Sequence, residues 1–294
     1  MPSGIVIIDK PAGWTSMDVC AKMRGILREK RVGHGGTLDP MATGVLPILV
    51  GRATRALDLL PVHDKRYTAT LRFGYTSDTL DVWGTVTPTG RPLPSLSAIE
   101  AALPAFRGGI RQIPPMMSAL KKDGVRLYDL ARQGVEIERE ARPVTIYSLD
   151  ILGYDPAAGE LRLDCHCSRG TYIRSLCDDL GRRLDGAGAI MTALRRTMAA
   201  GYTLEDCLPL EEARRLAETG ELAVRVLPTD SAFSSFPSLA VTAAQAVRFG
   251  NGGALDLERL KQPVTSPVRV YGPDGAFLGL GKPEDGALKI LKLF

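Results

Sequence analysis

The chain of 294 residues is 45% hydrophobic and 24% charged, and both values are ordinary for a soluble globular protein. Its length suits one large domain with a small one, or two medium domains, and allows a sizeable core without disulfides. A formal net charge of +4 permits a nucleic-acid partner but does not require one. Composition therefore leaves the function open.

The cysteines exclude a disulfide framework, because the five of them are odd in number and scattered along the chain. No apolar run approaches the length of a membrane span. The apolar run 5–8 is too short for a signal peptide, and Asp9 and Lys10 interrupt it. We therefore expect a cytoplasmic protein in a reducing compartment, with no membrane partner.

The first predicted element is a short buried strand at residues 5–8. A helix follows, with Thr15 or Ser16 as its N-cap. Its apolar positions repeat at intervals typical of one helix face: Val19, Met23, Ile26 and Leu27. A glycine-rich loop then leads to a predicted strand at 45–50.

Further along the chain, strands and helices alternate at irregular intervals. Strands are predicted at 67–73, 144–152 and 161–168, and helices at 95–106 and 171–184. Residues 107–142 hold eight lysines and arginines against five acidic residues, which indicates an exposed, mildly basic insertion. This organisation favours a mixed, largely antiparallel α/β domain over a doubly wound parallel one.

A break near residues 227–230 divides the chain into predicted domains 1–228 and 229–294. In the second domain we expect a helix at 240–249 and short strands at 267–271 and 287–293. This composition is compatible with a small β-rich domain.

The loop 33–40 carries the first candidate for chemistry. Pro40 keeps Asp39 out of the α region, and the surrounding glycines let the backbone bend sharply and a ligand approach closely. Asp39 is therefore a candidate nucleophile or base. The alternative is that Asp39 only caps an Asx-turn, which is common for an aspartate before proline. The residues alone leave both interpretations open.

His34, in the same loop, is a general base, a phosphate contact or a structural donor. No serine or cysteine is obviously paired with it, so a hydrolase triad has little support. The loop also matches neither glycine-rich nucleotide-binding pattern, so we expect no nucleotide cofactor.

Arg174 follows the apolar Ile173 on the predicted helix and so lies beside the buried face. It either pairs with Asp178 one turn later, or it is partly buried and needs another carboxylate, for which Asp39 is a candidate. Tyr67 is either an ordinary edge aromatic or a ring that stacks on a base.

Cys165, His166 and Cys167 raise the question of a metal site. Strand alternation places both cysteines on one face and His166 on the other, and no second pair follows at zinc spacing. We therefore predict that the cysteines belong to the core and that the protein binds no metal.

Several motifs resemble those of bacterial tRNA pseudouridine-55 synthases of the TruB type. The stretch 33–47, GHGGTLDPMATGVLP, resembles the active-site motif of that family. Other stretches are similar to further family motifs in the same order: DKPAGWTS at 9–16, GRATR at 51–55, KRY at 65–67, DTLDVWG at 78–84, QIPPMMSA at 112–119, GVRLYDLAR at 124–132, CSRGTYIR at 167–174 and LRR at 194–196. The resemblance covers about residues 4–210.

Three positions depart from the family pattern. Gly35 stands where threonine is usual and Met117 where an aromatic is common, and the usual histidine before Leu194 is missing, with Ala189 nearby. These departures concern loop contacts rather than the chemistry. Residues 229–294 resemble the family's PUA domain, so we expect a small PUA-like RNA-binding domain there.

The resemblance implies a pseudouridine-synthase catalytic domain around a central, largely antiparallel sheet. It also implies isomerisation of uridine to pseudouridine at position 55 in the TΨC loop of tRNA, after the base is flipped out and without a cofactor. In this family-based interpretation Asp39 is the nucleophile and Arg174 pairs with it and keeps it ionised. Tyr67 stacks on the uracil and is a candidate for removing the final C5 proton.

The resemblance further implies that Lys10 and the insertion 107–142 contact tRNA phosphates. His34 contacts the backbone of the flipped nucleotide, and Tyr172 and Leu194 line the pocket. The expected partner is the TΨC stem-loop, and we expect a monomer.

Two other functions stay open from the sequence. One is a non-catalytic tRNA-binding or folding-chaperone module that uses the same basic insertion and C-terminal domain. The other is a metal-independent hydrolase built on His34 and Asp39, which lacks a nucleophile–base pair.

Overall fold

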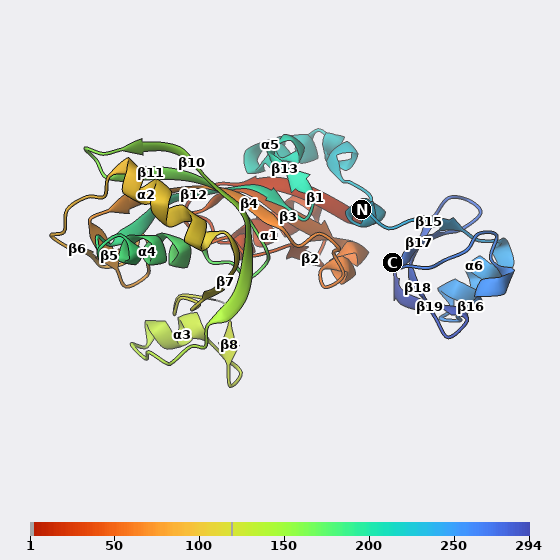
Figure 1. Cartoon of the computed structure of the whole chain (residues 1–294). Coiled ribbons are helices and arrows are strands. Elements are labelled where there is room, and N and C mark those ends of the chain that lie inside the picture. Colours follow the sequence, from red (N-terminus) through yellow and green to blue (C-terminus); the bar gives the residue numbers. More distant parts are fainter. Residues whose placement is uncertain (1–2, 119) are drawn as a thin grey trace. The chain divides into compact units, whose positions relative to one another are not determined.

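The computed structural model describes residues 3–118 and 120–294 (Figure 1), and by its internal contacts the chain divides into two compact units. The first unit comprises Met1–Asp39, Leu46–Val62 and Ala200–Phe294, and the second comprises Pro40–Val45 and His63–Ala199. The chain therefore passes from the first unit to the second at the peptide bond between Asp39 and Pro40.

The first unit contains a sheet in which β1 (Gly4–Lys10) lies between β14 (Leu208–Pro209) and β3 (Thr43–Val50). β2 (Val32–His34) pairs antiparallel with the last residues of β3. Residues 5–8 of β1 are all buried, and such a continuous apolar run is typical of a strand that is covered on both faces. The predicted strands at 5–8 and 45–50 are confirmed.

Helix α1 (Ser16–Leu27) begins at a capping box. The Thr15 side chain accepts from the backbone N–H of Asp18, and the Asp18 carboxylate accepts from the N–H of Thr15. The apolar face of α1 packs in one core with β1, β3 and α5 (Leu210–Glu218). The predicted helix is confirmed, with Thr15 as its N-cap.

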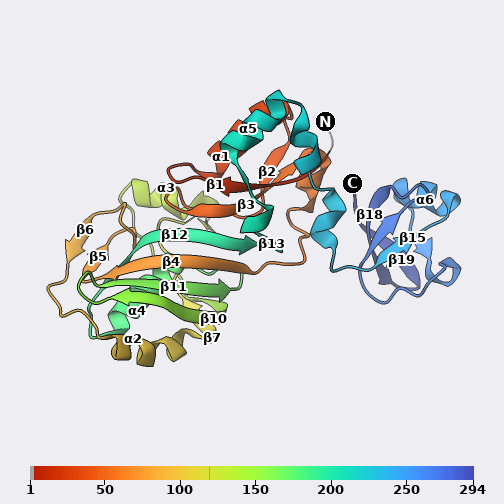
Figure 2. The same ribbon diagram turned by 90° about the horizontal axis from the view of Figure 1, so that it is seen from above.

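The second unit contains a sheet with the strand order β3, β12, β4, β11, β10, β7 (Figure 2). Its further members are β12 (Ala189–Ala199), β4 (Lys65–Phe73), β11 (Glu160–Cys167), β10 (Arg142–Asp155) and β7 (Gly108–Gln112). The pair β3–β12 is parallel, and the other neighbours are antiparallel. The prediction of a mixed, largely antiparallel α/β fold is confirmed.

Two helices of the second unit follow the predicted pattern. α4 (Ile173–Arg183) packs against β12 and buries its apolar face, which includes Leu176 and Leu180. α2 (Leu96–Ala102) begins at the Ser95 cap and continues as the 3-10 segment η2 (Leu103–Phe106). Both predicted helices are therefore confirmed, and α2 ends in a 3-10 segment.

β12 is the central strand that the sequence does not predict. Its residues, AIMTALRRTMA, include several of the strongest helix formers. The strand nevertheless pairs with β3 on one edge and β4 on the other, so tertiary pairing and burial override the local preference.

The expected insertion begins with a strand of the sheet and continues as a hairpin and a helix. β7 pairs with β10 at the edge of the sheet, and its last residue, Gln112, is 2% exposed. The hairpin of β8 (Lys121–Lys122) and β9 (Val125–Arg126) follows, and then α3 (Leu127–Arg132). All four strand residues of this hairpin are exposed.

The remaining short elements connect these parts. In the second unit β5 (Tyr75–Ser77) pairs with β6 (Val86–Pro88). The first unit also contains η1 (Gly51–Ala56), β13 (Tyr202–Thr203), η3 (Leu204–Asp206), η4 (Glu221–Arg225) and η5 (Thr229–Phe233).

The C-terminal part is β-rich, as the sequence predicts. Its sheet has the order β15 (Ser238–Ala240), β17 (Val268–Tyr271), β18 (Phe277–Glu284), β19 (Ala287–Leu293) and β16 (Leu255–Asp256). With α6 (Ala243–Gly250) and η6 (Leu257–Arg259), it encloses an apolar cluster that includes Phe249 and Val270. No helix within the described part of the chain is long and apolar enough to span a membrane.

Candidate active site

Lys10 lies at the end of β1 and is fully buried, with 0% of its surface exposed. Its ammonium donates to the carbonyl oxygens of Pro11, at 2.9 Å, and Trp14, at 2.5 Å. These bonds hold the turn that leads into α1. The resemblance implies a phosphate contact for Lys10, whereas in this structure its ammonium lies inside the protein and bonds to backbone.

Asp39 lies in the irregular loop between β2 and β3 and is half-buried. Hydrogen bonds of two preceding residues hold the loop in front of Asp39. The N–H of Gly35 donates to the carbonyl of Pro47 at 2.8 Å, and the backbone of Leu38 bonds to the side chain of Ser16. His34 is the last residue of β2 and lies opposite Ile48 of β3. The carboxylate therefore stands on a fixed loop.

Tyr67 and Leu194 lie on the neighbouring strands β4 and β12 of the second unit, and both side chains are buried. Tyr67 pairs in register with Arg196, and Leu194 pairs with Ala69. Residues two positions apart on a strand point to the same face, so Leu194 and Arg196 share a face of β12. These two predicted pocket residues are brought together by the sheet.

A row of close backbone contacts connects the segment after Asp39 to this pair of strands. Gly44 of β3 pairs with Arg196, which in turn pairs with Tyr67. Gly44 has φ +102°, and a Cβ there would overlap the Arg196 backbone. Only glycine combines that conformation with that approach. Pro40, which is bonded covalently to Asp39, belongs to the same compact unit as this row.

Arg196 is a functional candidate that the sequence interpretation does not single out. Its long side chain is fully buried, and its Nε donates to the Val45 carbonyl at 2.7 Å. Burial and the nearby charge of Arg196 lower the pKa of Lys65. The sequence shows two adjacent arginines, Arg195 and Arg196. It does not show that Arg196 is buried, because this burial depends on β12 being a strand.

Arg174 is the second residue of α4 and is 5% exposed. Its guanidinium donates to two carbonyl oxygens, that of Thr79 at 3.0 Å and that of Met117 at 2.8 Å. Its Nε also lies 3.8 Å from the buried carboxylate of Asp81. Arg174 thus ties α4 to the loop 78–84 and to the insertion, and the carboxylate of Asp81 lies beside it.

Asp81 is held in turn by its own loop. Its carboxylate accepts from the hydroxyl of Thr79 at 2.7 Å and from the N–H of Trp83 at 2.9 Å. The other acidic residue considered for Arg174, Asp178, bonds instead to Arg182 at 2.8 Å. Asp81 is part of the motif at 78–84, but its pairing could not be found by helical spacing.

Tyr172 precedes α4 and is fixed through its backbone. The side-chain amide of Gln112 accepts from the Tyr172 N–H at 3.0 Å and donates to its carbonyl at 3.2 Å. The buried end of β7 therefore sets the start of α4, and with it the position of Arg174.

The cysteines of β11 are buried, as predicted. Cys165 and Cys167 are both inaccessible to solvent, and a hydrogen bond from Cys165 lowers the pKa of Cys167. Cys165 lies opposite Tyr67 in the β4–β11 register, so this cysteine is a neighbour of Tyr67 within the sheet.

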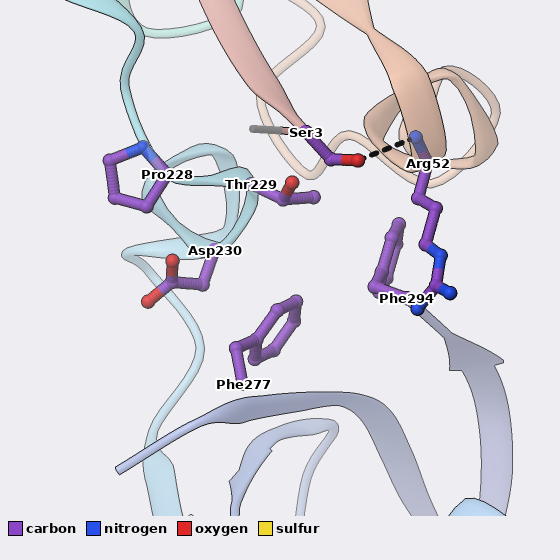
Figure 3. Close-up of a pocket in the computed structure, with 7 residues that line it drawn as sticks. All are labelled: Ser3, Arg52, Pro228, Thr229, Asp230, Phe277 and Phe294. Atoms are coloured by element: carbon purple, nitrogen blue, oxygen red, sulfur yellow. Dashed lines mark hydrogen bonds between the residues drawn. The ribbon is translucent and has the colours of Figure 1, made fainter. Parts of the chain in front are cut away.

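A separate pocket of about 340 Å³ lies elsewhere in the first unit (Figure 3). It is lined by Ser3, Arg52, Pro228, Thr229, Asp230, Phe277 and Phe294. The hydroxyl of Ser3 accepts from the Arg52 N–H at 2.9 Å, and Asp230 accepts from the hydroxyl of Tyr271 at 2.6 Å. Because the lining includes no predicted site residue, this pocket is distinct from the candidate site.

Three family models match successive parts of the chain. Residues 24–173 match the TruB family pseudouridylate synthase N-terminal domain. Residues 174–234 match the tRNA pseudouridylate synthase B C-terminal domain, and residues 237–293 match the C-terminal model of pseudouridine synthase II TruB. The first model contains Asp39 and Tyr67, and Arg174 begins the second.

Curated relatives match over nearly the whole length. The tRNA pseudouridine synthase B of Haemophilus influenzae is 42% identical over 280 residues, which cover 94% of this chain and 88% of the relative. The tRNA pseudouridine synthase B of Pasteurella multocida is 42% identical over 285 residues, covering 96% of this chain and 92% of the relative.

A solved structure has the same fold. A chain in the crystal structure of a Cbf5-Nop10-Gar1 complex superposes with a TM-score of 0.74 at 25% identity, covering 99% of this chain and 84% of that one. With the family models and the relatives, this similarity shows that the chain belongs to the TruB family of pseudouridylate synthases.

Proposed function

We propose that this protein isomerises uridine to pseudouridine at position 55 in the TΨC loop of tRNA, with Asp39 as the nucleophile. The observation that carries the proposal is the near full-length similarity to tRNA pseudouridine synthase B of other bacteria. The fixed loop that presents Asp39 and the buried strands that present Tyr67 and Leu194 support it.

The proposed reaction begins when the Asp39 carboxylate attacks either C1′ of the ribose or C6 of the uracil. The bond between N1 and C1′ breaks, the uracil rotates, and C5 forms the new bond to C1′. N1 gains one proton and C5 loses one, so product and substrate have the same atoms and no oxidant or cofactor is consumed. Exclusion of water protects the intermediate.

Each remaining residue has a proposed role in this reaction. Arg174 pairs with Asp39 and keeps the carboxylate ionised and oriented. Tyr67 stacks on the uracil and takes part in removing the C5 proton. Tyr172 and Leu194 line the pocket.

The RNA-binding surface follows from the exposed cations of the insertion. Lys121, Lys122 and Arg126 are exposed on the β8–β9 hairpin, and the Arg126 guanidinium lies 5.6 Å from the ring centroid of Tyr128. We assign them contacts with tRNA phosphates, and we assign His34 a contact with the backbone of the flipped nucleotide. Residues 229–294 serve as a PUA-like RNA-binding domain in this proposal.

The test is Asp39→Asn, measured by tritium release from tRNA transcript that carries 5-tritiated uridine. The amide is nearly isosteric but is not a nucleophile, so turnover should be abolished while tRNA binding stays within about twofold. Release of tritium at the wild-type rate by the variant would refute the nucleophile assignment. Mapping pseudouridine in the wild-type product tests the position, and binding without any modification would favour a tRNA-binding module instead.

A further inference from the structure

One buried hydroxyl connects the start of α1 to the loop of Asp39. The Oγ of Ser16 accepts from the N–H of Leu38 at 2.8 Å and donates to the carbonyl of Leu38 at 3.2 Å. Ser16 is 2% exposed and Leu38 is 3% exposed, so water does not compete for these groups. A single side chain thus satisfies both polar backbone groups of a residue 22 positions away.

The anchor of this contact is rigid. Ser16 is the first residue of α1, where the capping box between Thr15 and Asp18 fixes the helix start. The preceding turn is held by the buried ammonium of Lys10. Val19, on the next turn of α1, is fully buried in the core of the first unit. The Ser16 hydroxyl therefore occupies a position set by packed and bonded structure on both sides.

The bonded residue is the immediate neighbour of Asp39. The two bonds fix the orientation of the Leu38 peptide groups, and the ring of Pro40 restricts the backbone of Asp39 from the other side. With both flanks of Asp39 restricted, the backbone has less freedom to change the direction of the carboxylate. Leu38 itself is buried and cannot shift without opening the core.

We propose that Ser16 is a positioning residue that sets the direction of the Asp39 carboxylate; this inference rests on the proposed role of Asp39 as nucleophile. A hydroxyl suits the task because it donates one hydrogen bond and accepts others at the same atom. Alanine offers neither, so it leaves the N–H and the carbonyl of Leu38 buried without this partner.

Ser16→Ala tests the inference. The loss of both bonds lets the Leu38 peptide turn, so the nucleophile is misaligned while the RNA-binding surface is kept. We expect the single-turnover rate at saturating enzyme to fall by about tenfold or more, because small misplacements of a reacting group are costly. The dissociation constant for the T-arm RNA should stay within about twofold of wild type, as expected when only positioning is lost.

Two further variants separate positioning from general loss of stability. Val19→Ala removes buried methyl groups from the same helix but leaves the Ser16 hydroxyl in place, and it should lower the melting temperature with little change in rate. Ser16→Thr keeps a hydroxyl on the same carbon and should restore most of the rate that Ser16→Ala loses.

Each outcome decides the inference. A wild-type rate in Ser16→Ala, an equal loss in Val19→Ala, or no recovery in Ser16→Thr would overturn it. Asp39→Asn, measured beside them, keeps the two proposals distinct. If Asp39→Asn is inactive and Ser16→Ala is fully active, only the positioning role fails; if Asp39→Asn is active, the nucleophile assignment itself fails.

Discussion

Arg174 is fixed by two segments outside its own helix, the loop 78–84 and the insertion, and this explains why a single sequence pattern could not describe it. Helical spacing places it beside the buried face of α4, which is correct, and offers Asp178 as its partner. The structure gives Asp178 to Arg182 and places Asp81 near Arg174. The contact with Asp81 depends on how the loop 78–84 folds back, which local periodicity does not encode.

We expect Arg174→Lys to lose about 100-fold or more in single-turnover rate. Lysine keeps the charge but lacks the planar fork that reaches two carbonyls and a carboxylate at once. The measurement is tritium release at saturating enzyme. Arg182→Lys is the matched control, because Arg182 lies on the same helix, 72% exposed, and should keep its rate. Equal rates for both variants would exclude a special role for the Arg174 guanidinium.

Ser16 is a second residue whose contacts could not be predicted from a local sequence pattern. The sequence identifies it only as a possible N-cap, and the structure gives that role to Thr15. Its bonds to Leu38 span two elements whose separation is set by the core. A pattern within 12 or so residues, the scale of a helix, cannot detect such a contact.

Among the elements, the prediction succeeds where the apolar period is clear and fails where the environment decides. α1, β4 and β11 have regular patterns, and their predicted positions are confirmed. β12 has helix-forming residues and becomes a strand because β3 and β4 flank it. Motif resemblance names a set of candidate site residues, whereas the burial of Arg196 depends on the strand β12 and the contact of Asp81 with Arg174 depends on the loop 78–84.

Gly44 is the point at which β3 approaches β12, so we expect Gly44→Ala to be severely destabilising. The added Cβ would overlap the Arg196 carbonyl, and the positive φ strains any other residue. The combined cost should exceed about 3 kcal/mol, because the obstructing atoms are backbone and cannot move aside. Urea denaturation measures it.

Gly25→Ala is the control for that substitution. Gly25 lies within α1, and a Cβ there meets no atom within 4 Å. Alanine should therefore stabilise the helix by about 0.5–1 kcal/mol. A Gly44→Ala variant as stable as wild type would show that β3 and β12 can separate.

The β8–β9 hairpin should contribute to RNA affinity through charge alone. We expect Lys121→Ala combined with Lys122→Ala to weaken tRNA binding and to reduce the slope of log affinity against log salt by roughly 0.7–0.9 for each lost phosphate contact. Filter binding over a range of salt concentrations measures this slope. Arg214→Ala with Arg215→Ala removes two exposed, ion-paired charges from α5 and should leave the slope unchanged. Identical slopes for both double variants would remove the hairpin from the RNA-binding surface.

At the scale of the molecule, the two compact units interleave along the chain, since residues 40–45 and 63–199 belong together. Such a division arises from contacts between distant strands, and a break in composition at one position cannot reveal it. The core of the first unit nevertheless contains the residues that the helix pattern predicts, including Val19 and Met23. The apolar period of a helix therefore predicts which residues are buried, but it does not predict which other elements they pack against.

The buried thiol of Cys20 gives this core a pH dependence. Burial raises the pKa of Cys20 from 9.0 to about 11. The folded state therefore holds the proton more tightly than the unfolded state, so stability is intact below pH 9 and is lost as the pH rises towards 11. The loss should reach at most about 3 kcal/mol.

We expect Cys20→Ala to lose less stability than wild type between pH 8 and pH 10.5, because alanine has no proton to release. Thermal melting at the two pH values, compared between the proteins, cancels the titration of all other groups. Val19→Ala creates a similar small cavity without removing a titrating group, and should follow the wild-type pH dependence. If the melting temperatures of Cys20→Ala and Val19→Ala fall equally between the two pH values, Cys20 does not titrate within the folded core.

The parallel pairing of β3 with β12 also has a consequence for the order of events during protein synthesis. One edge of β3 receives its partner only when Arg195 and Arg196 are available, about 150 residues after Thr43 and Gly44 have been made. A ribosome-bound chain therefore carries the Asp39 loop long before the strand beside it exists. We therefore expect that a chain lacking β12 cannot complete the strands around the candidate site, so that competence for catalysis arises only after Arg196 has been made.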